Sequence, residues 1–84
     1  MSYTLHIQPQ AEKDASSLPR EVYDRCRKAI LKLEGDPRPH GSQKLVGDDG
    51  YRIRVGSYRI LYRIDDSMKR LYIYRIKHRK EVYR

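Results

Sequence analysis

The sequence has a single cysteine, Cys26, and it has neither phenylalanine nor tryptophan among its 84 residues. One cysteine cannot form an internal disulfide, so a disulfide-stabilised secreted fold is excluded. No apolar run reaches transmembrane length, and no basic segment followed by an apolar one stands near the start. We therefore expect a cytoplasmic protein that does not associate with a membrane.

Groupings of metal ligands and phosphate-binding loops are also missing. His6, His40 and His78 are widely separated, and no cysteine or carboxylate stands at ligand spacing from them. There is no Gly-rich phosphate loop. Cys26 falls on the apolar side of a helical pattern, which predicts a core residue rather than a nucleophile. We expect no metal site and no cofactor.

Positive charge is what the sequence has in excess. Lys and Arg number 19 against 11 Asp and Glu, which gives a formal net charge of +8. Nearly all of the excess lies after residue 50, in segments that read as strands rather than as a flexible tail. A structured basic face favours nucleic acid as the partner over a membrane surface.

The first half of the chain reads as a strand and two helices. Alternating apolar residues predict a strand at Tyr3–Ile7, and Pro9 suits the first turn of a weak helix ending near Ser17. A clear apolar stripe predicts a second helix over Arg20–Glu34. Gly35 is expected to end it as the residue after the C-cap, and Pro37 and Pro39 prevent its continuation.

The second half reads as strands. A brief edge strand or a turn is expected at Lys44–Val46, and a last strand, apolar on both faces, at about Arg70–Ile76. With a hairpin between them, the order is β-α-α-β-β-β. It predicts one α+β domain over residues 1–84, a small twisted antiparallel sheet with an N-terminal helical hairpin on one face.

The stretch Tyr51–Tyr62 predicts that β-hairpin, closed by Gly56 and Ser57. A two-residue loop with Gly first suits a type II′ turn and fixes the register. The cross-strand pairs on the core side would then be Tyr51–Tyr62, Ile53–Ile60 and Val55–Tyr58. The other side would carry Arg52, Arg54, Arg59 and Arg63, with Arg54 directly opposite Arg59. Because like charges that face each other destabilise a sheet, this face is expected to bind an anion, with phosphate the first candidate.

The side chains available for chemistry are thus arginine, lysine, tyrosine and one late histidine, His78. Arginine stays protonated at neutral pH, so this set has no strong general base, although it can neutralise a phosphate and stack on bases. RNA is a substrate that suits these side chains, because its own 2′-OH can attack the adjacent phosphate.

The segments GYRIRVGSYRILYRID and IKHRKEVYR, with the order of elements, resemble the RelE/ParE superfamily of toxins from toxin–antitoxin pairs. The resemblance covers essentially the whole chain, and the tail HRKEVY is closer to the RelE branch. That branch implies a ribosome-dependent, metal-independent endoribonuclease that cuts mRNA in the A site by 2′-OH attack. The expected partners are the ribosome with its rRNA and mRNA, and a RelB-like antitoxin that wraps the toxin.

The resemblance also implies roles for individual residues. Arg59 matches an arginine that contacts the scissile phosphate, and Tyr83 matches a C-terminal tyrosine that stacks on an mRNA base. Arg79 is preferred over Lys77 for a further basic position before that tyrosine, and His78 is a candidate general acid or base. The implied catalytic set is Arg54, Arg59, His78, Arg79 and Tyr83, and the implied RNA-binding set is Arg52, Lys77 and Lys80.

The sequence departs from the family pattern in two places. Arg52 and Arg54 stand where the best-known members have lysine, which weakens any role as a general base there. The chain ends one residue after Tyr83, so a helix present beyond this tyrosine in some relatives is expected to be absent and the tail to be mobile. Two alternatives stay open, a ParE-like inhibitor of DNA gyrase and a non-catalytic RNA-binding or ribosome-binding module.

Overall fold

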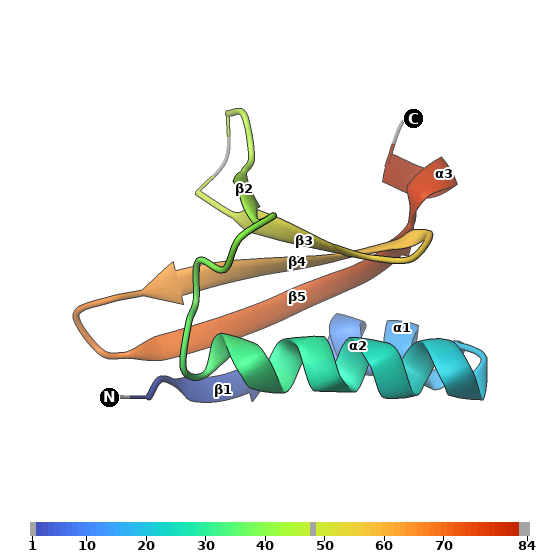
Figure 1. The fold of residues 1–84 in the computed structure, drawn as a ribbon, viewed down its shortest axis with the longest axis horizontal. Helices are drawn as coiled ribbons and strands as arrows, with labels where there is room; N and C mark the ends of the chain where they lie inside the picture. Colours follow the sequence, from blue (N-terminus) through green and yellow to red (C-terminus); the bar gives the residue numbers. More distant parts are fainter. Residues whose placement is uncertain (1, 48, 83–84) are drawn as a thin grey trace.

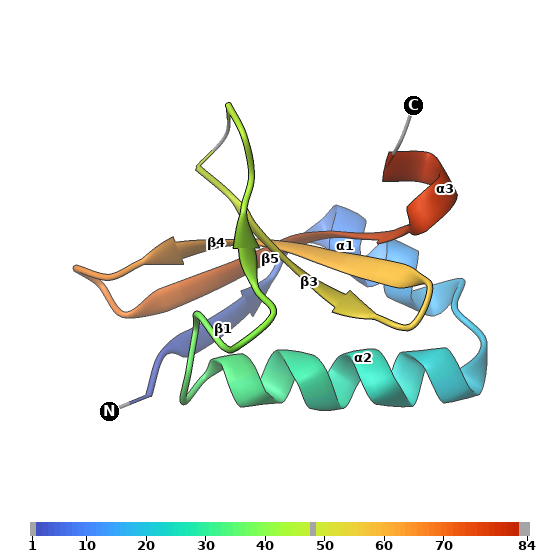
Figure 2. The same ribbon diagram turned by 45° about the horizontal axis from the view of Figure 1, so that its top comes forward.

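A sheet with α1 and α2 packed on one side forms the framework of the molecule (Figures 1 and 2). The computed structural model describes residues 2–47 and 49–82. Their elements, in chain order, are β1 (Thr4–Ile7), α1 (Pro9–Ser16), α2 (Arg20–Leu33), β2 (Gln43–Lys44), β3 (Tyr51–Val55), β4 (Tyr58–Asp65), β5 (Arg70–His78) and α3 (Arg79–Val82). The α+β class and the helical hairpin on one face are confirmed.

Within the described part of the chain, the strands form one five-stranded sheet in the order β1-β5-β4-β3-β2. The pairs from β2 to β5 are antiparallel, but β1 runs parallel to β5, with Leu5 opposite Leu71. The wholly antiparallel sheet predicted from the sequence is therefore wrong at this edge. All the elements between these two strands separate them along the chain, and a parallel pair requires a long connection of that kind.

Two smaller predictions are also corrected, and the predicted end of α2 is confirmed. The edge strand lies at Gln43–Lys44 rather than at Lys44–Val46. The prediction that Gly35 follows the C-cap of α2 is confirmed, because Glu34 is the C-cap, and the backbone N–H groups of Gly35 and Asp36 both donate to the Lys32 carbonyl. The last strand continues past Ile76 to His78, and residues 79–82, which the predicted element order leaves outside any helix or strand, form α3. The predicted mobile tail at Tyr83 lies outside the described residues.

The core lies between the helices and the face of the sheet that we call the inner face. It contains Ile53, Ile60, Tyr62, Leu71, Ile73 and Ile76 from the sheet, and Ala11, Cys26, Ile30 and Leu33 from α1 and α2. Cys26 is 1% exposed, as predicted for a core residue, and burial raises the pKa of its thiol. Tyr62 is fully buried and donates its hydroxyl to the Pro37 carbonyl at 2.8 Å, while burial raises its pKa to about 12. The prediction that Tyr51, Tyr58 and Tyr62 pack on the core side is confirmed.

Helix α1 covers the edge of β5 that β1 leaves uncovered. β1 ends at Ile7, and the next edge bond runs from the Gln8 N–H to the Ile73 carbonyl at 2.8 Å. Beyond it, Asp14 of α1 accepts bonds from the Ile76 N–H at 2.9 Å and from the Arg75 Nε at 2.8 Å. The carboxylate thus takes the place of a neighbouring strand and fixes the end of β5 that leads into α3.

Candidate phosphate-binding site

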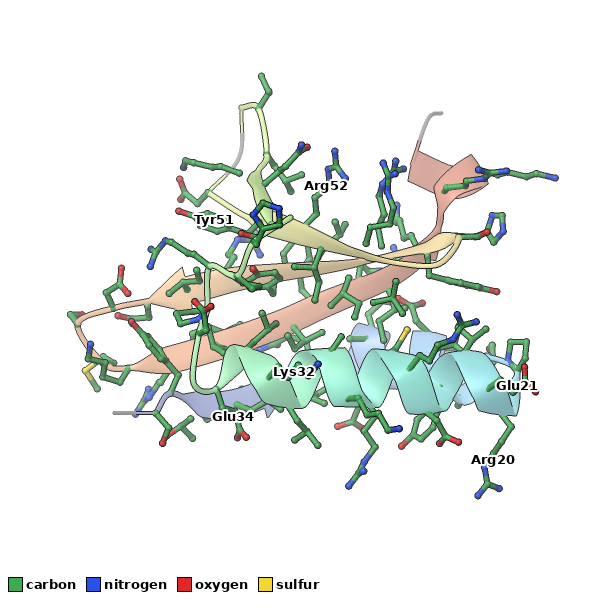
Figure 3. All side chains as sticks on the ribbon, viewed as in Figure 1. Arg20, Glu21, Lys32, Glu34, Tyr51 and Arg52 are labelled. Carbon is green, nitrogen blue, oxygen red and sulfur yellow. The ribbon has the colours of Figure 1, made fainter. Side chains whose placement is uncertain are left out.

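The turn between β3 and β4 has the geometry expected from the sequence. Gly56 has a φ of +60°, whereas Ser57 does not have a positive φ, which is the combination a type II′ turn requires. The register is also as predicted, with Val55 opposite Tyr58 and Arg54 opposite Arg59. The arginines therefore lie on the face of the sheet away from the helices, which we call the outer face. Figure 3 shows Arg52 on this side of β3.

The end of β5 is brought to the same turn by the β4–β5 pairing. Lys77 lies opposite Arg59 and His78 lies opposite Tyr58. This register results from a bulge in β5, where one extra residue stands between the partners of Leu61 and Tyr62. The Arg79 N–H then donates to the Ser57 carbonyl at 2.7 Å, which fixes the start of α3 against the hairpin turn. A row of three cations, Arg54, Arg59 and Lys77, thus runs across β3, β4 and β5.

The hairpin turn and the start of α3 line a pocket of about 400 Å³. Its described lining residues are Arg54, Gly56, Ser57, Tyr58, Arg59, Arg79 and Lys80, and they include no carboxylate. Arg59 is only 4% exposed, so it lies at the base of the pocket, whereas Arg54, Arg79 and Lys80 are exposed. Cations gathered in this way bind an anion strongly, and arginine presents paired donors that match a phosphate.

The other predicted site residues lie around the pocket without lining it. Arg52 donates from its Nη2 to the Gln43 Oε1 on β2, and Lys77 is the cross-strand neighbour of Arg59. His78 packs edge-on against Tyr58 with ring centroids 5.0 Å apart, and its Nδ1 accepts the Lys80 N–H at 3.2 Å. This contact gives His78 a role at the start of α3; its role in proton transfer stays a prediction. Tyr83 lies outside the described residues.

Arg25 reaches the hairpin turn from α2, and sequence reasoning missed it. Its Nη1 lies 3.8 Å from the position that a Cβ on Gly56 would occupy. On the helix, Arg25 is one of several exposed cations, so no pattern in the sequence distinguishes it from Arg27 or Lys28. Only the packing of α2 beneath β3 brings its guanidinium to the turn that lines the pocket.

Asp14 connects the site to the helical layer. Burial opposes the ionisation of its carboxyl, but hydrogen bonds from Arg75, the Ile76 N–H and Gln10 outweigh that effect and lower its pKa. The carboxylate is therefore charged at neutral pH and holds β5 just before Lys77, His78 and Arg79.

The described residues, 2–47 and 49–82, contain neither a candidate metal site nor a membrane-spanning helix. No group of three or more His, Cys, Asp or Glu side chains is placed to hold a metal ion. No helix among them is long and apolar enough to cross a membrane. A second hollow of about 440 Å³, between α1, α2 and β1, is lined mainly by apolar residues such as Leu5, Cys26 and Ile30, and does not suit an anion.

The fold and the pocket together define a small basic α+β protein with a pocket lined by cations beside a β-hairpin turn. Residues 5–83 match the family model described as the ParE toxin of the type II toxin–antitoxin system parDE. Because the match spans nearly the whole sequence, the chain belongs to the RelE/ParE superfamily and is a toxin of a type II toxin–antitoxin system.

Individual relatives carry RelE-type names. Toxin RelG of Mycobacterium tuberculosis is 33% identical over 88 residues, which cover 100% of this chain and 99% of the relative. A RelE–RelB complex from Pyrococcus horikoshii matches with 33% identity and a TM-score of 0.80, over 94% of this chain and 97% of that one. The complex RelBE2 from M. tuberculosis matches with 27% identity and a TM-score of 0.83, over 93% and 99% of the two chains.

Proposed function

We propose that this toxin is a ribosome-dependent endoribonuclease that cleaves mRNA in the A site and so inhibits translation in the cytoplasm. The observation that carries the proposal is the pocket itself, where Arg54, Arg59, Arg79 and Lys80 from three elements converge. The sequence-derived expectation of a scissile phosphate at Arg59 agrees with the position of this residue at the base of the pocket. A cluster of this kind stabilises the charge that develops on a phosphate in the transition state.

In the proposed reaction the RNA supplies its own nucleophile. The 2′-oxygen forms a bond to the adjacent phosphorus while the bond to the 5′-oxygen of the next nucleotide breaks. The 2′-OH loses its proton and the leaving 5′-oxygen gains one, so that the products are a 2′,3′-cyclic phosphate and a 5′-hydroxyl. Arg54 and Arg59 would bind the non-bridging oxygens, and Arg79 would bind from the side of α3. Positioning and charge stabilisation are then the main contributions of the protein.

The remaining predicted residues would act on the same RNA. Arg52, Lys77 and Lys80 are proposed to bind the backbone around the scissile phosphate, since Lys77 neighbours Arg59 and Lys80 lines the pocket. Tyr83 is proposed to stack on a base of the codon, and His78 to transfer a proton when the ribosome reorganises the start of α3.

A RelB-like antitoxin is the proposed partner that neutralises the toxin. The solved relatives from P. horikoshii and M. tuberculosis are complexes named for RelE-type or RelBE-type toxin–antitoxin pairs. An acidic or helix-forming segment that wraps this basic domain would block entry to the ribosome or displace the site residues.

A second candidate function, inhibition of DNA gyrase, is favoured by one observation, the match to the family model named for the ParE toxin. One experiment separates the candidates. The purified protein is added to translating ribosomes and the mRNA is analysed by primer extension, with a gyrase supercoiling assay in parallel. Codon-positioned cleavage with normal supercoiling supports the proposal. Loss of supercoiling with intact mRNA would establish the gyrase inhibitor instead, and ribosome binding with intact mRNA a non-catalytic module.

A further inference from the structure

The outer face of the sheet carries aromatic side chains at the end away from the pocket. His6 on β1 lies opposite Tyr72 on β5, and Tyr72 lies opposite Arg63 on β4. Arg63 shares its face with Arg59 because the two positions differ by four along β4, an even number. This row therefore belongs to the same face as the pocket arginines, and α1 and α2 lie on the opposite side (Figures 1 and 2).

The side chains of this row form two stacked pairs. The rings of His6 and Tyr72 lie 5.3 Å apart with an interplanar angle of 23°, and the Arg63 guanidinium lies 4.2 Å from the centre of the Tyr74 ring. His6, Tyr72 and Tyr74 are half-buried, and Arg63 is exposed. We call His6, Arg63, Tyr72 and Tyr74 the aromatic row. Stacked aromatic rings beside a cation form a surface on which further planar groups, such as bases, can stack.

The aromatic row leads into the basic pocket without an intervening carboxylate among the outer-face positions of the strands. Leu61, Arg52 and Arg75 come next, followed by Lys77, Arg59 and Arg54. Asp14 contacts Arg75, but from the edge of the sheet. Asp65, beyond the aromatic row, accepts bonds from Ser67 and Met68 in its own turn. Tyr72 and Lys77 are five residues apart on β5, which corresponds to about 16 Å along the strand.

We propose that the aromatic row is a base-stacking surface for single-stranded RNA whose backbone continues over the outer face into the pocket. The inference rests on the proposed function in one respect: the RNA that stacks on the aromatic row is taken to be the RNA whose phosphate enters the pocket. Single-stranded nucleic acid is recognised by a basic track together with aromatic rings, and the outer face offers both, with the rings at one end. The charge of the face suits a polyanion, and the rings supply contacts that a free phosphate would not use.

Binding of a fluorescent single-stranded oligouridylate to the full chain, followed by anisotropy without ribosomes, tests the proposal. The double variant Tyr72→Leu/Tyr74→Leu removes the rings and keeps apolar bulk. We expect it to bind about ten-fold more weakly, the loss of roughly one stacked base. Arg63→Gln should make the plot of log K against log salt concentration less steep. The slope should change by about 0.7, the value of one phosphate contact on a single strand. The matched control is Tyr23→Leu, which replaces an exposed tyrosine on α2. This variant should bind RNA as the wild type does.

The thermal midpoint of each variant shows whether it folds. Should the double variant unfold, ultraviolet cross-linking of the wild-type chain to 4-thiouridine RNA gives an independent measurement, with cross-links expected on Tyr72 or Tyr74. Wild-type affinity in a folded double variant, or cross-links confined to other surfaces, would overturn the proposal. It would also be overturned if the variant kept RNA affinity and lost only the antitoxin, because the row would then serve a protein.

The outcome is separable from that of the proposed function. Intact mRNA on ribosomes together with weakened oligouridylate binding would remove the nuclease and retain the stacking surface. A folded double variant that cleaves mRNA and binds oligouridylate as the wild type does would remove the stacking surface and retain the nuclease.

Discussion

At the scale of single residues, the site consists of cations that the backbone forces together. Arg54 and Arg59 are direct cross-strand partners, and Arg59 is almost completely buried. Like charges on facing positions of a sheet repel each other, and a bound phosphate would offset this repulsion. This repulsion is the physical reason to place the reaction at this pocket.

Replacing Arg79 by alanine should lower ribosome-dependent mRNA cleavage by roughly 10²–10³-fold, the usual loss when one donor to a developing negative charge is removed. Arg79 is exposed, so its guanidinium can be removed with little effect on folding. Primer extension measures the rate, and the thermal midpoint checks the fold. Arg20→Ala is the matched control, since Arg20 points away from the sheet at the start of α2 and pairs only weakly with Asp24 (Figure 3). Equal rates for the two variants would contradict the assignment of Arg79.

Replacing Asp14 by asparagine should destabilise the protein by about 1–3 kcal/mol at neutral pH, because Arg75 and the Ile76 N–H lose a charged acceptor. The pKa of Asp14 is lowered in the folded state. Its contribution is therefore complete above the unfolded pKa of about 3.9 and is lost as the pH falls through the lower folded value. Urea denaturation at neutral and acidic pH measures this. The difference between variant and wild type should shrink in acid, and a constant difference would show that the charge is not responsible.

The residues of the hairpin could be predicted from sequence because a two-residue turn fixes their register locally. The cross-strand pair Arg54–Arg59 follows from that register alone. Arg25 could not be found in this way, because its proximity to Gly56 depends on how α2 packs beneath the sheet. The burial of Arg59 also depends on neighbours from other elements, whereas alternation predicts an exposed side chain at that position.

At the scale of elements, the β3–β4 turn sets the geometry of the pocket, and Gly56 sets the geometry of the turn. Gly56→Ala should destabilise the protein by about 1–2 kcal/mol, because a φ of +60° is strained for a residue with a Cβ. It should also lower cleavage, since Arg54, Arg59 and Ser57 are positioned by this turn.

The chain offers a matched control for that prediction in Gly35→Ala. Gly35 does not have a positive φ, and a Cβ there would meet no atom within 4 Å. This variant should be neutral or slightly more stable, because alanine reduces the entropy of the unfolded chain. Thermal unfolding and primer extension on both variants give the comparison. Equal stability of the two proteins would contradict the role assigned to the turn.

The element order could be predicted from sequence because it depends on local patterns. The sheet topology could not be predicted in this way. The apolar stripe of α2 and the alternation of β3 and β4 are local patterns. The parallel pairing of β1 with β5 and the bulge opposite Leu61 depend on contacts between distant parts of the chain. The bulge decides which residues of β5 lie beside the residues that line the pocket, since it places Lys77 opposite Arg59 and His78 opposite Tyr58.

At the scale of the whole molecule, the net charge of +8 and the position of that charge have one consequence. The excess of cations lies after residue 50, mostly on the outer face and around the pocket, while α1 and α2 occupy the other side of the sheet. Binding to ribosomes or RNA should therefore weaken steeply with salt, since counterions are released from each phosphate contact. The same field would give the proposed acidic antitoxin segment a fast, long-range attraction to the toxin.

The most direct test of the account uses ribosomes programmed with mRNA whose A-site codon carries either ribose or 2′-deoxyribose. The wild-type protein should cut the ribose codon and leave a 2′,3′-cyclic phosphate, and it should not cut the deoxyribose codon. Arg59→Lys, which keeps the charge but loses the paired donors, should cut the ribose codon more slowly. An intact ribose codon, or cleavage of the deoxyribose codon at the same rate, would contradict the proposed function.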